Sequence, residues 1–184
     1  MAAEEPTTEK WERWQKKRIF VREIAGKYGE VYRQLLEQPR VYKSKHVPWK
    51  GGPTLFERAV INPQHAPVTQ AIETHILTLA PGSYGQKHGH INSAVFYILN
   101  GKGYDIHDGK RIDWEAGDVC IVENGCVHQH FNADPNRPAQ FVIFKAKPLF
   151  LFLHLLFQKN VEYPPSEPMA GWENYKPEDQ HADQ

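Results

Sequence analysis

Short apolar runs separated by tight-turn pairs fill the middle of the chain. Between residues 68 and 147 the runs are five to nine residues long, and the turn pairs are Pro81-Gly82, Asn100-Gly101, Asp108-Gly109 and Asn124-Gly125. Asn-Gly and Asp-Gly favour tight turns between strands, because these residues tolerate a left-handed backbone. Residues 103–114, with Asp108-Gly109 at their centre, are predicted to form a hairpin. Short strands with such turns predict an all-β sandwich or barrel over residues 68–147.

The N-terminal region, residues 1–67, has a different pattern. One stripe is spaced three and four residues apart and consists of Trp11, Trp14, Arg18, Val21, Ala25, Tyr28, Tyr32 and Leu35. This spacing predicts an amphipathic helix that packs on the barrel or on a partner, weakened at Gly26 and Gly29 and ended by Pro39. Residues 40–67 are rich in proline, glycine, histidine and lysine, and are predicted to be a long ordered arm or loop.

The C-terminal region, residues 148–184, begins with an apolar run at residues 149–157, interrupted by His154. This run is too apolar for a surface loop, so it is expected to be a buried helix or strand, or a contact between subunits. Together with the N-terminal stripe it exceeds what one small barrel needs for its core, and a homodimer or larger assembly is expected. The proline-rich tail after Tyr163 is expected to be extended and largely loose.

Composition narrows the classes of partner and compartment. The 184 residues carry 22 Lys and Arg against 22 Asp and Glu, and a neutral chain lacks the basic surface typical of nucleic-acid binding. The cysteines, Cys120 and Cys126, are too few for a disulfide framework. The N-terminus lacks the apolar core of a secretion signal, and a nine-residue apolar run is too short to span a bilayer. A cytoplasmic protein with no nucleic-acid or membrane partner is expected.

Candidate chemistry lies in two histidine clusters among the ten histidines of the chain. Residues two apart on a strand share a face, which groups Gln86 with His88 and His90, and His128 with His130 and Asn132. Neutral imidazole is a good ligand for iron, zinc, copper and nickel. Two such pairs on strands of one barrel predict a metal site, and the alternative is a set of surface histidines that titrate near neutral pH.

The spacing around these histidines resembles the two motifs of the cupin superfamily. In the first motif the matching residues are Gly82, His88, His90 and Gly101; in the second they are Gly117, Gly125, His128 and Asn132. The resemblance covers residues 68–147. It implies a double-stranded β-helix, the jelly-roll barrel of cupins, with a metal bound inside by His88, His90 and His128.

The chain departs from the cupin motifs at two positions. Ala94 stands where the family has a glutamate ligand, and Glu123 stands in place of a turn proline. Ala94 leaves three histidine ligands and more open coordination positions for a substrate and O2. A set of three nitrogen ligands is better for Fe(II) than for Mn, and Ni, Cu and Zn remain alternatives.

Within the cupins, residues 88–94 and 128–132 resemble the gentisate and salicylate group of dioxygenases, which use three histidines and lack the glutamate. That resemblance implies Fe(II)-dependent cleavage of a C–C bond in a small aromatic or enolisable hydroxy acid, with both atoms of O2 incorporated. His130 could then take a substrate proton, and Gln86 could hydrogen-bond substrate or O2; the plainer alternatives are a supporting hydrogen bond and a polar residue at the barrel mouth.

Other roles stay open at this stage. Arg58, Arg111 and Arg137 are the candidates for binding a substrate carboxylate, because arginine pairs with carboxylates through two parallel bonds. His107, just before a turn, is expected to face solvent, and His75 to be a satisfied core or surface histidine. The N-terminal arm could cover the barrel mouth.

Three further function classes remain as alternatives. Asn92-Ser93 loosely resembles the thiol dioxygenases, which also use three histidines. A non-redox cupin lyase, isomerase or hydrolase is the second, and a module that binds a small ligand without turnover is the third.

Overall fold

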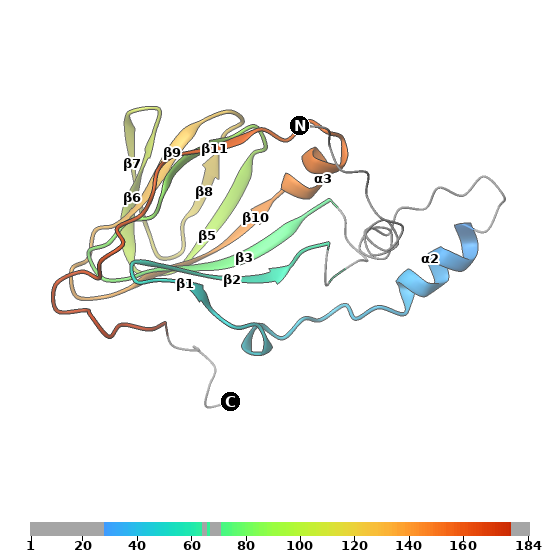
Figure 1. Ribbon diagram of the computed structural model, residues 1–184, viewed down its shortest axis with the longest axis horizontal. Coiled ribbons are helices and arrows are strands. Elements are labelled where there is room, and N and C mark those ends of the chain that lie inside the picture. Colours follow the sequence, from blue (N-terminus) through green and yellow to red (C-terminus); the bar gives the residue numbers. More distant parts are fainter. Residues whose placement is uncertain (1–27, 64–65, 67–70, 178–184) are drawn as a thin grey trace, which may run out of the picture.

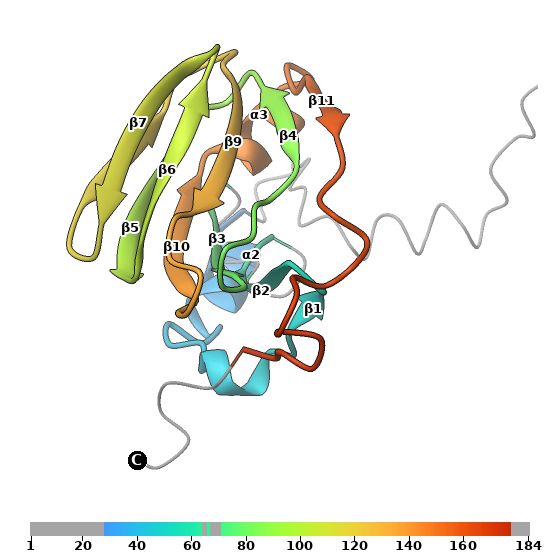
Figure 2. The same ribbon diagram turned by 90° about the vertical axis from the view of Figure 1, so that its left-hand side faces the viewer.

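Two antiparallel sheets lie face to face and form the body of the molecule (Figures 1 and 2). The computed structural model describes residues 28–63, 66 and 71–177. The six-stranded sheet runs in the order β1 (Lys50–Gly51), β2 (Leu55–Ile61), β3 (Glu73–Leu79), β10 (Ala139–Lys145), β5 (Ala94–Asn100) and β8 (Val119–Val122). The five-stranded sheet runs in the order β11 (Gln158–Glu162), β4 (Lys87–His90), β9 (Val127–Asn132), β6 (Lys102–His107) and β7 (Lys110–Glu115).

The core lies between the sheets because inward and outward residues alternate along the strands. In β5, Ala94, Phe96 and Ile98 are buried, whereas Val95 and the other alternate residues are exposed. Phe96, Ile98, Leu79 and Phe141 have no exposed surface at all. Burying such side chains is worth about 1.5–3 kcal/mol each, so this alternation fixes which face of each strand points inward. The all-β jelly-roll fold predicted from the sequence is confirmed.

The predicted turn pairs do not all close hairpins. Asp108-Gly109 joins β6 to β7 in one sheet, as predicted. The pairs Asn100-Gly101 and Asn124-Gly125 instead join strands of opposite sheets. Gly101 has a φ of 86°, and an added Cβ would lie 2.7 Å from the backbone of Ala139. The turn residues therefore predicted where the chain reverses direction, but they did not predict which strands pair.

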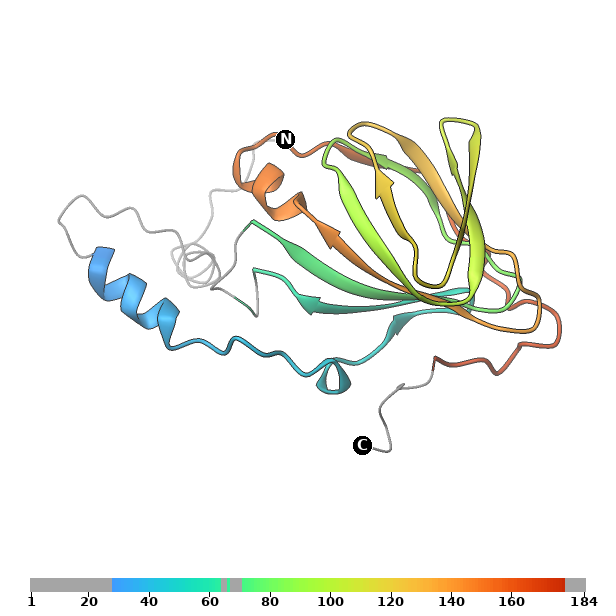
Figure 3. The same cartoon turned by 180° about the vertical axis from the view of Figure 1, so that it is seen from behind.

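The prediction of an arm or loop at residues 40–67 is wrong at residues 50–51 and 55–61, which form β1 and β2. Strand β2 pairs with β3 along almost its whole length, so the six-stranded sheet extends beyond residues 68–147. Helix α2 (Tyr28–Leu36) and the short helix η1 (Ser44–His46) precede these strands, and α2 stands apart from both sheets (Figures 1 and 3). The rest of the predicted N-terminal helix lies outside the described residues.

The apolar run at residues 149–157 is largely exposed, so the expectation of a buried helix or strand is wrong. Helix α3 (Lys147–Phe152) follows β10, and five large apolar side chains after its start are at least half exposed: Leu151, Phe152, Leu153, Leu155 and Phe157. The subunit contact stays a prediction. No described helix is long and apolar enough to span a membrane.

The tail is not loose over its described part. Just before the tail, strand β11 pairs with β4, the strand that carries His88 and His90. Further on, the Trp172 indole donates a hydrogen bond to the Pro135 carbonyl at 3.1 Å. The Tyr175 ring packs edge-on against Phe56, with the ring centroids 5.8 Å apart. The contacts of Trp172 and Tyr175 tie the tail to the barrel as far as residue 175.

Candidate metal site

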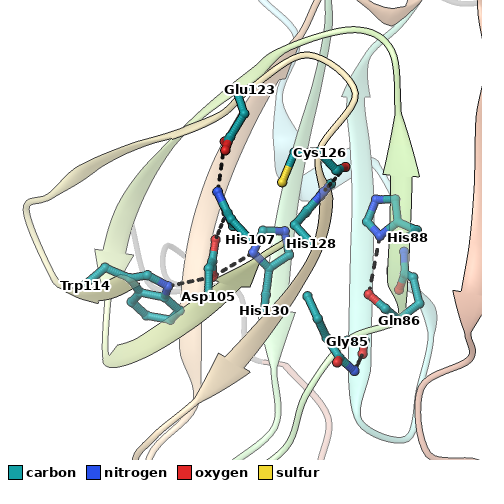
Figure 4. Close-up of polar contacts among 11 residues, drawn as sticks. Gly85, Gln86, His88, Asp105, His107, Trp114, Glu123, Cys126, His128 and His130 are labelled. Carbon is teal, nitrogen blue, oxygen red and sulfur yellow. Dashed lines mark hydrogen bonds and ion pairs between the residues drawn. The ribbon is translucent and has the colours of Figure 1, made fainter. Parts of the chain in front are cut away.

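Three histidines from two neighbouring strands converge inside the barrel, and Figure 4 shows two of them, His88 and His128. His88 and His90 lie on β4, and His128 lies directly opposite His88 on β9. One ring nitrogen from each histidine lies within 4.8 Å of those of the other two. Because this is the residue set that the cupin motifs imply, the geometry supports the predicted metal ligands.

The backbone orients all three rings in the same way. In each, Nδ1 lies near the carbonyl oxygen of a residue two positions away: Gln86 at 3.3 Å for His88, Asn92 at 2.6 Å for His90, and Cys126 at 3.3 Å for His128. A carbonyl only accepts hydrogen bonds, so Nδ1 carries the proton and Nε2 keeps its lone pair. Metal-binding histidines are commonly oriented this way by a partner on the other nitrogen.

The electrostatics of the site keep these imidazoles neutral. Burial, followed by the nearby His130, lowers the pKa of His88 to about 4 and that of His128 to about 2. Burial also lowers the pKa of His90. Neutral imidazole is the form that binds metal. Three convergent and unprotonated nitrogens therefore fit a divalent transition metal.

A pocket adjoins the three histidines and takes in the predicted substrate-side residues. Its lining comprises Leu55, Glu57, Leu77, Gly85, Gln86, His88, His90, Ala94, Phe96, Val122, His128, His130, Ile143 and Lys145. Ala94 is 5% exposed and lies on the pocket wall beside the histidines. A methyl group there cannot bind a metal, so the three imidazoles lack a carboxylate at this position.

None of the three candidate arginines lines this pocket. Arg58 stacks on the Trp49 ring at 4.3 Å. Arg111 stacks on Tyr104 at 3.7 Å and pairs with Asp113 at 2.7 Å. Arg137 lines a separate surface hollow near Asn100 and Pro138. The structure thus places none of the three candidate arginines on the wall of the pocket beside the histidines.

Asp105, which the sequence analysis did not single out, holds His130 in place. This carboxylate on β6 is 1% exposed and lies 2.9 Å from His130 Nδ1, 3.2 Å from His107 Nε2 and 2.8 Å from the Trp114 indole nitrogen, which donates to it (Figure 4). Burial opposes its charge, but the neighbouring His130, His107 and Trp114 hold the pKa of Asp105 well below its usual range. Its place two residues before His107 on one strand was the available sequence signal.

His107 is buried, so the prediction that it faces solvent is wrong. Its Nδ1 lies 2.9 Å from a Glu123 carboxylate oxygen, and its Nε2 faces Asp105. The hydrogen bond to Asp105, followed by the one to Glu123, raises the pKa of His107. Glu123 thus has a role at the position of the motif's proline. His107, Glu123 and Cys126 form a second convergent group, but both nitrogens of the His107 ring already face carboxylates, which favour N–H donors over a free lone pair for a metal.

The chain matches the family model described as the cupin domain over residues 75–145. Among curated proteins it is 28% identical to a gentisate 1,2-dioxygenase of Ralstonia sp. over 123 residues, which cover 62% of this chain and 34% of that protein. It is 29% identical to a 5-aminosalicylate 1,2-dioxygenase of Comamonas sp. over 77 residues, covering 41% of this chain and 21% of that protein. The chain thus spans about a third or less of these relatives.

Solved structures agree with the fold. A salicylate 1,2-dioxygenase from Pseudaminobacter salicylatoxidans superposes with a TM-score of 0.55 at 18% identity, covering 63% of this chain and 33% of that one. A variant of oxalate decarboxylase from Bacillus subtilis superposes with a TM-score of 0.58 at 17% identity, covering 68% and 33%. The cupin-domain match over residues 75–145, the two facing sheets and the histidine spacing agree with one another, and the solved structures share this fold.

Proposed function

We propose that this protein is an Fe(II)-dependent dioxygenase that cleaves a C–C bond of a small aromatic or enolisable hydroxy acid. The observation that carries the proposal is the convergence of three neutral imidazoles beside Ala94, whose methyl group offers no ligand at the position of the family's glutamate. The resemblance to gentisate and 5-aminosalicylate dioxygenases favours this reaction class.

His88, His90 and His128 would hold the metal through their Nε2 atoms. When bound, Fe(II) supplies the redox chemistry through which O2 is reduced at the expense of the substrate. The side chains of the protein would position the substrate and exclude water from the pocket. Phe96, Val122 and neighbouring apolar side chains line the pocket and limit access of water.

His130 and Gln86 are proposed to act on the substrate. Asp105 accepts a hydrogen bond from His130 Nδ1, so Nε2 is left to accept a phenolic proton from a substrate in the pocket. The ring is fixed further by edge contact with Phe96, with centroids 5.2 Å apart. Gln86 lines the same pocket and has both an amide donor and an acceptor for a substrate oxygen.

Anaerobic loading with Fe(II), followed by an oxygen-electrode panel, tests the proposal. Uptake of O2 with gentisate, salicylate or related hydroxy acids, together with loss of the aromatic absorbance, is the expected result. Uptake only with thiols would instead identify a thiol dioxygenase. Turnover without O2 would identify a non-redox cupin, and saturable binding without turnover a binding module. Parallel loading with Mn, Ni, Cu and Zn identifies the active metal.

A further inference from the structure

Lys145, which no sequence motif marked, enters the pocket beside Ala94. It is the last residue of β10, and it follows the inward-facing Phe141 and Ile143 at intervals of two. In the sheet it pairs with Ala94 on β5 and with Glu73 on β3. Paired positions on neighbouring strands place their side chains next to each other on one face. The ammonium therefore approaches the side of the pocket where the fourth ligand of other cupins would stand.

Several charged groups surround this ammonium. Glu73 Oε1 lies 3.6 Å from Lys145 Nζ, and Glu57 on β2 lines the same pocket. His75 lies between the two carboxylates, 3.3 Å from Glu73 and 3.6 Å from Glu57, and Lys147 follows on the chain. Each acid thus has a basic partner besides Lys145. Burial lowers the pKa of Lys145, and the two carboxylates oppose that shift by favouring the charged form.

The contact with Glu73 leaves hydrogen-bonding capacity on Lys145. An ammonium has three N–H donors, and 3.6 Å exceeds the 2.7–2.9 Å of a charge-assisted hydrogen bond. The side chain keeps 18% of its surface exposed while lining the pocket. A purely structural ion pair would be expected to close to hydrogen-bond distance. The geometry instead leaves donors available to a ligand in the pocket.

We propose that Lys145 forms a carboxylate-binding subsite, which selects anionic hydroxy acids over neutral phenols. The inference rests on the proposed function for the identity of the pocket. The choice of Lys145 follows from the residues that line the pocket. Among those in the described part of the chain, Lys145 is the only lysine or arginine. A substrate carboxylate would lie between the histidine cluster and Lys145, over the methyl group of Ala94.

Binding of two matched probes tests this subsite without requiring turnover. Salicylate and salicylamide share the ring and the hydroxyl but differ in charge. Their affinities are measured by calorimetry on anaerobic Fe(II)-loaded protein. The wild type should bind salicylate at least tenfold more tightly, as expected for a hydrogen bond to a charged group. Lys145→Met should lose this preference, and Lys145→Arg should keep most of it.

Controls separate this proposal from the proposed reaction. Arg111→Met removes an exposed arginine that does not line the pocket and should bind both probes as the wild type does. An unchanged preference for salicylate in metal-loaded Lys145→Met, or equal binding of the two probes by the wild type, would overturn the subsite. The two proposals can also fail separately. If Lys145→Met loses the preference for salicylate while the wild type takes up no O2 with any hydroxy acid, the subsite is supported and the dioxygenase is refuted.

Discussion

Removing the Asp105 carboxylate should destabilise the barrel strongly. Asp105→Ala leaves three buried donors without their acceptor, those of His107, His130 and Trp114. A hydrogen bond to a charged group contributes about 1.5–3 kcal/mol, and breaking a buried charged pair costs about 3–5 kcal/mol. Since the three bonds share one carboxylate and are not additive, we expect a loss of about 3–5 kcal/mol in the free energy of unfolding at neutral pH.

Urea unfolding followed by circular dichroism measures this loss, and Asp113→Ala is its matched control. Asp113 lies on the neighbouring strand β7, but its side chain is 70% exposed and forms an ion pair with Arg111 at the surface. Exposed pairs contribute about 0–1 kcal/mol. A loss below 1 kcal/mol in Asp105→Ala, comparable to that of the control, would refute the assignment of Asp105 as the buried acceptor for these rings.

The pH dependence of the Asp105 effect has a definite sign. The folded pKa of Asp105 is depressed, so its contribution is present above the unfolded value of about 3.9 and is lost as the pH falls below it. The folded pKa of His107 is raised, so its contribution is complete below about 6.5 and is lost as the pH rises through the folded value. The difference between wild type and Asp105→Asn should therefore be largest between about pH 4 and 6.5.

Four more outcomes are expected. Ala94→Glu should bind metal at least as tightly but lower turnover, because a carboxylate then fills an open position; metal analysis and steady-state kinetics check this, and wild-type turnover in a metal-loaded variant would contradict it. His130→Gln should keep its iron and lose turnover, and loss of iron would count against its role. In metal-free protein the pKa values of His88 and His128 are lowered, so the unfolded state binds more protons than the folded state. The free energy of unfolding should therefore fall below about pH 6.5, by up to about 2.7 kcal/mol per pH unit for the two groups. A free energy of unfolding from urea titrations that does not change between about pH 6.5 and 4.5 would be inconsistent with this. The exposed apolar side chains of β5, β8 and α3 should support a homodimer, which a monomer in light scattering at micromolar concentration would disprove.

The strand pattern of the fold and the shared face of two candidate ligands were predictable because their signals are local. Alternation along β5 and the turn at Asp108-Gly109 depend on neighbouring residues alone. His88 and His90 share a strand face for the same reason. That His128 lies beside them could be predicted only from the resemblance to the cupin motifs, since local spacing does not show which distant strands pair.

The remaining site residues depend on contacts between distant segments. Lys145 reaches the pocket because β10 pairs with both β3 and β5, and a lysine at a strand end otherwise resembles a surface residue. His107 appeared to be at a turn, yet its partner Glu123 comes from the connection after β8. Strand β2 was hidden in a segment rich in proline and glycine, and its pairing with β3 is what orders it.

Incorporation of ¹⁸O2 tests the central claim most directly. Fe(II)-loaded protein is supplied with ¹⁸O2 and the hydroxy acid that gives the fastest O2 uptake, and the product is examined by mass spectrometry, with His128→Ala as the metal-site control. The account predicts a ring-opened product carrying two ¹⁸O atoms, one O2 consumed per substrate, and no product from His128→Ala. A product with one ¹⁸O atom or none, or equal product from His128→Ala, would contradict a three-histidine dioxygenase.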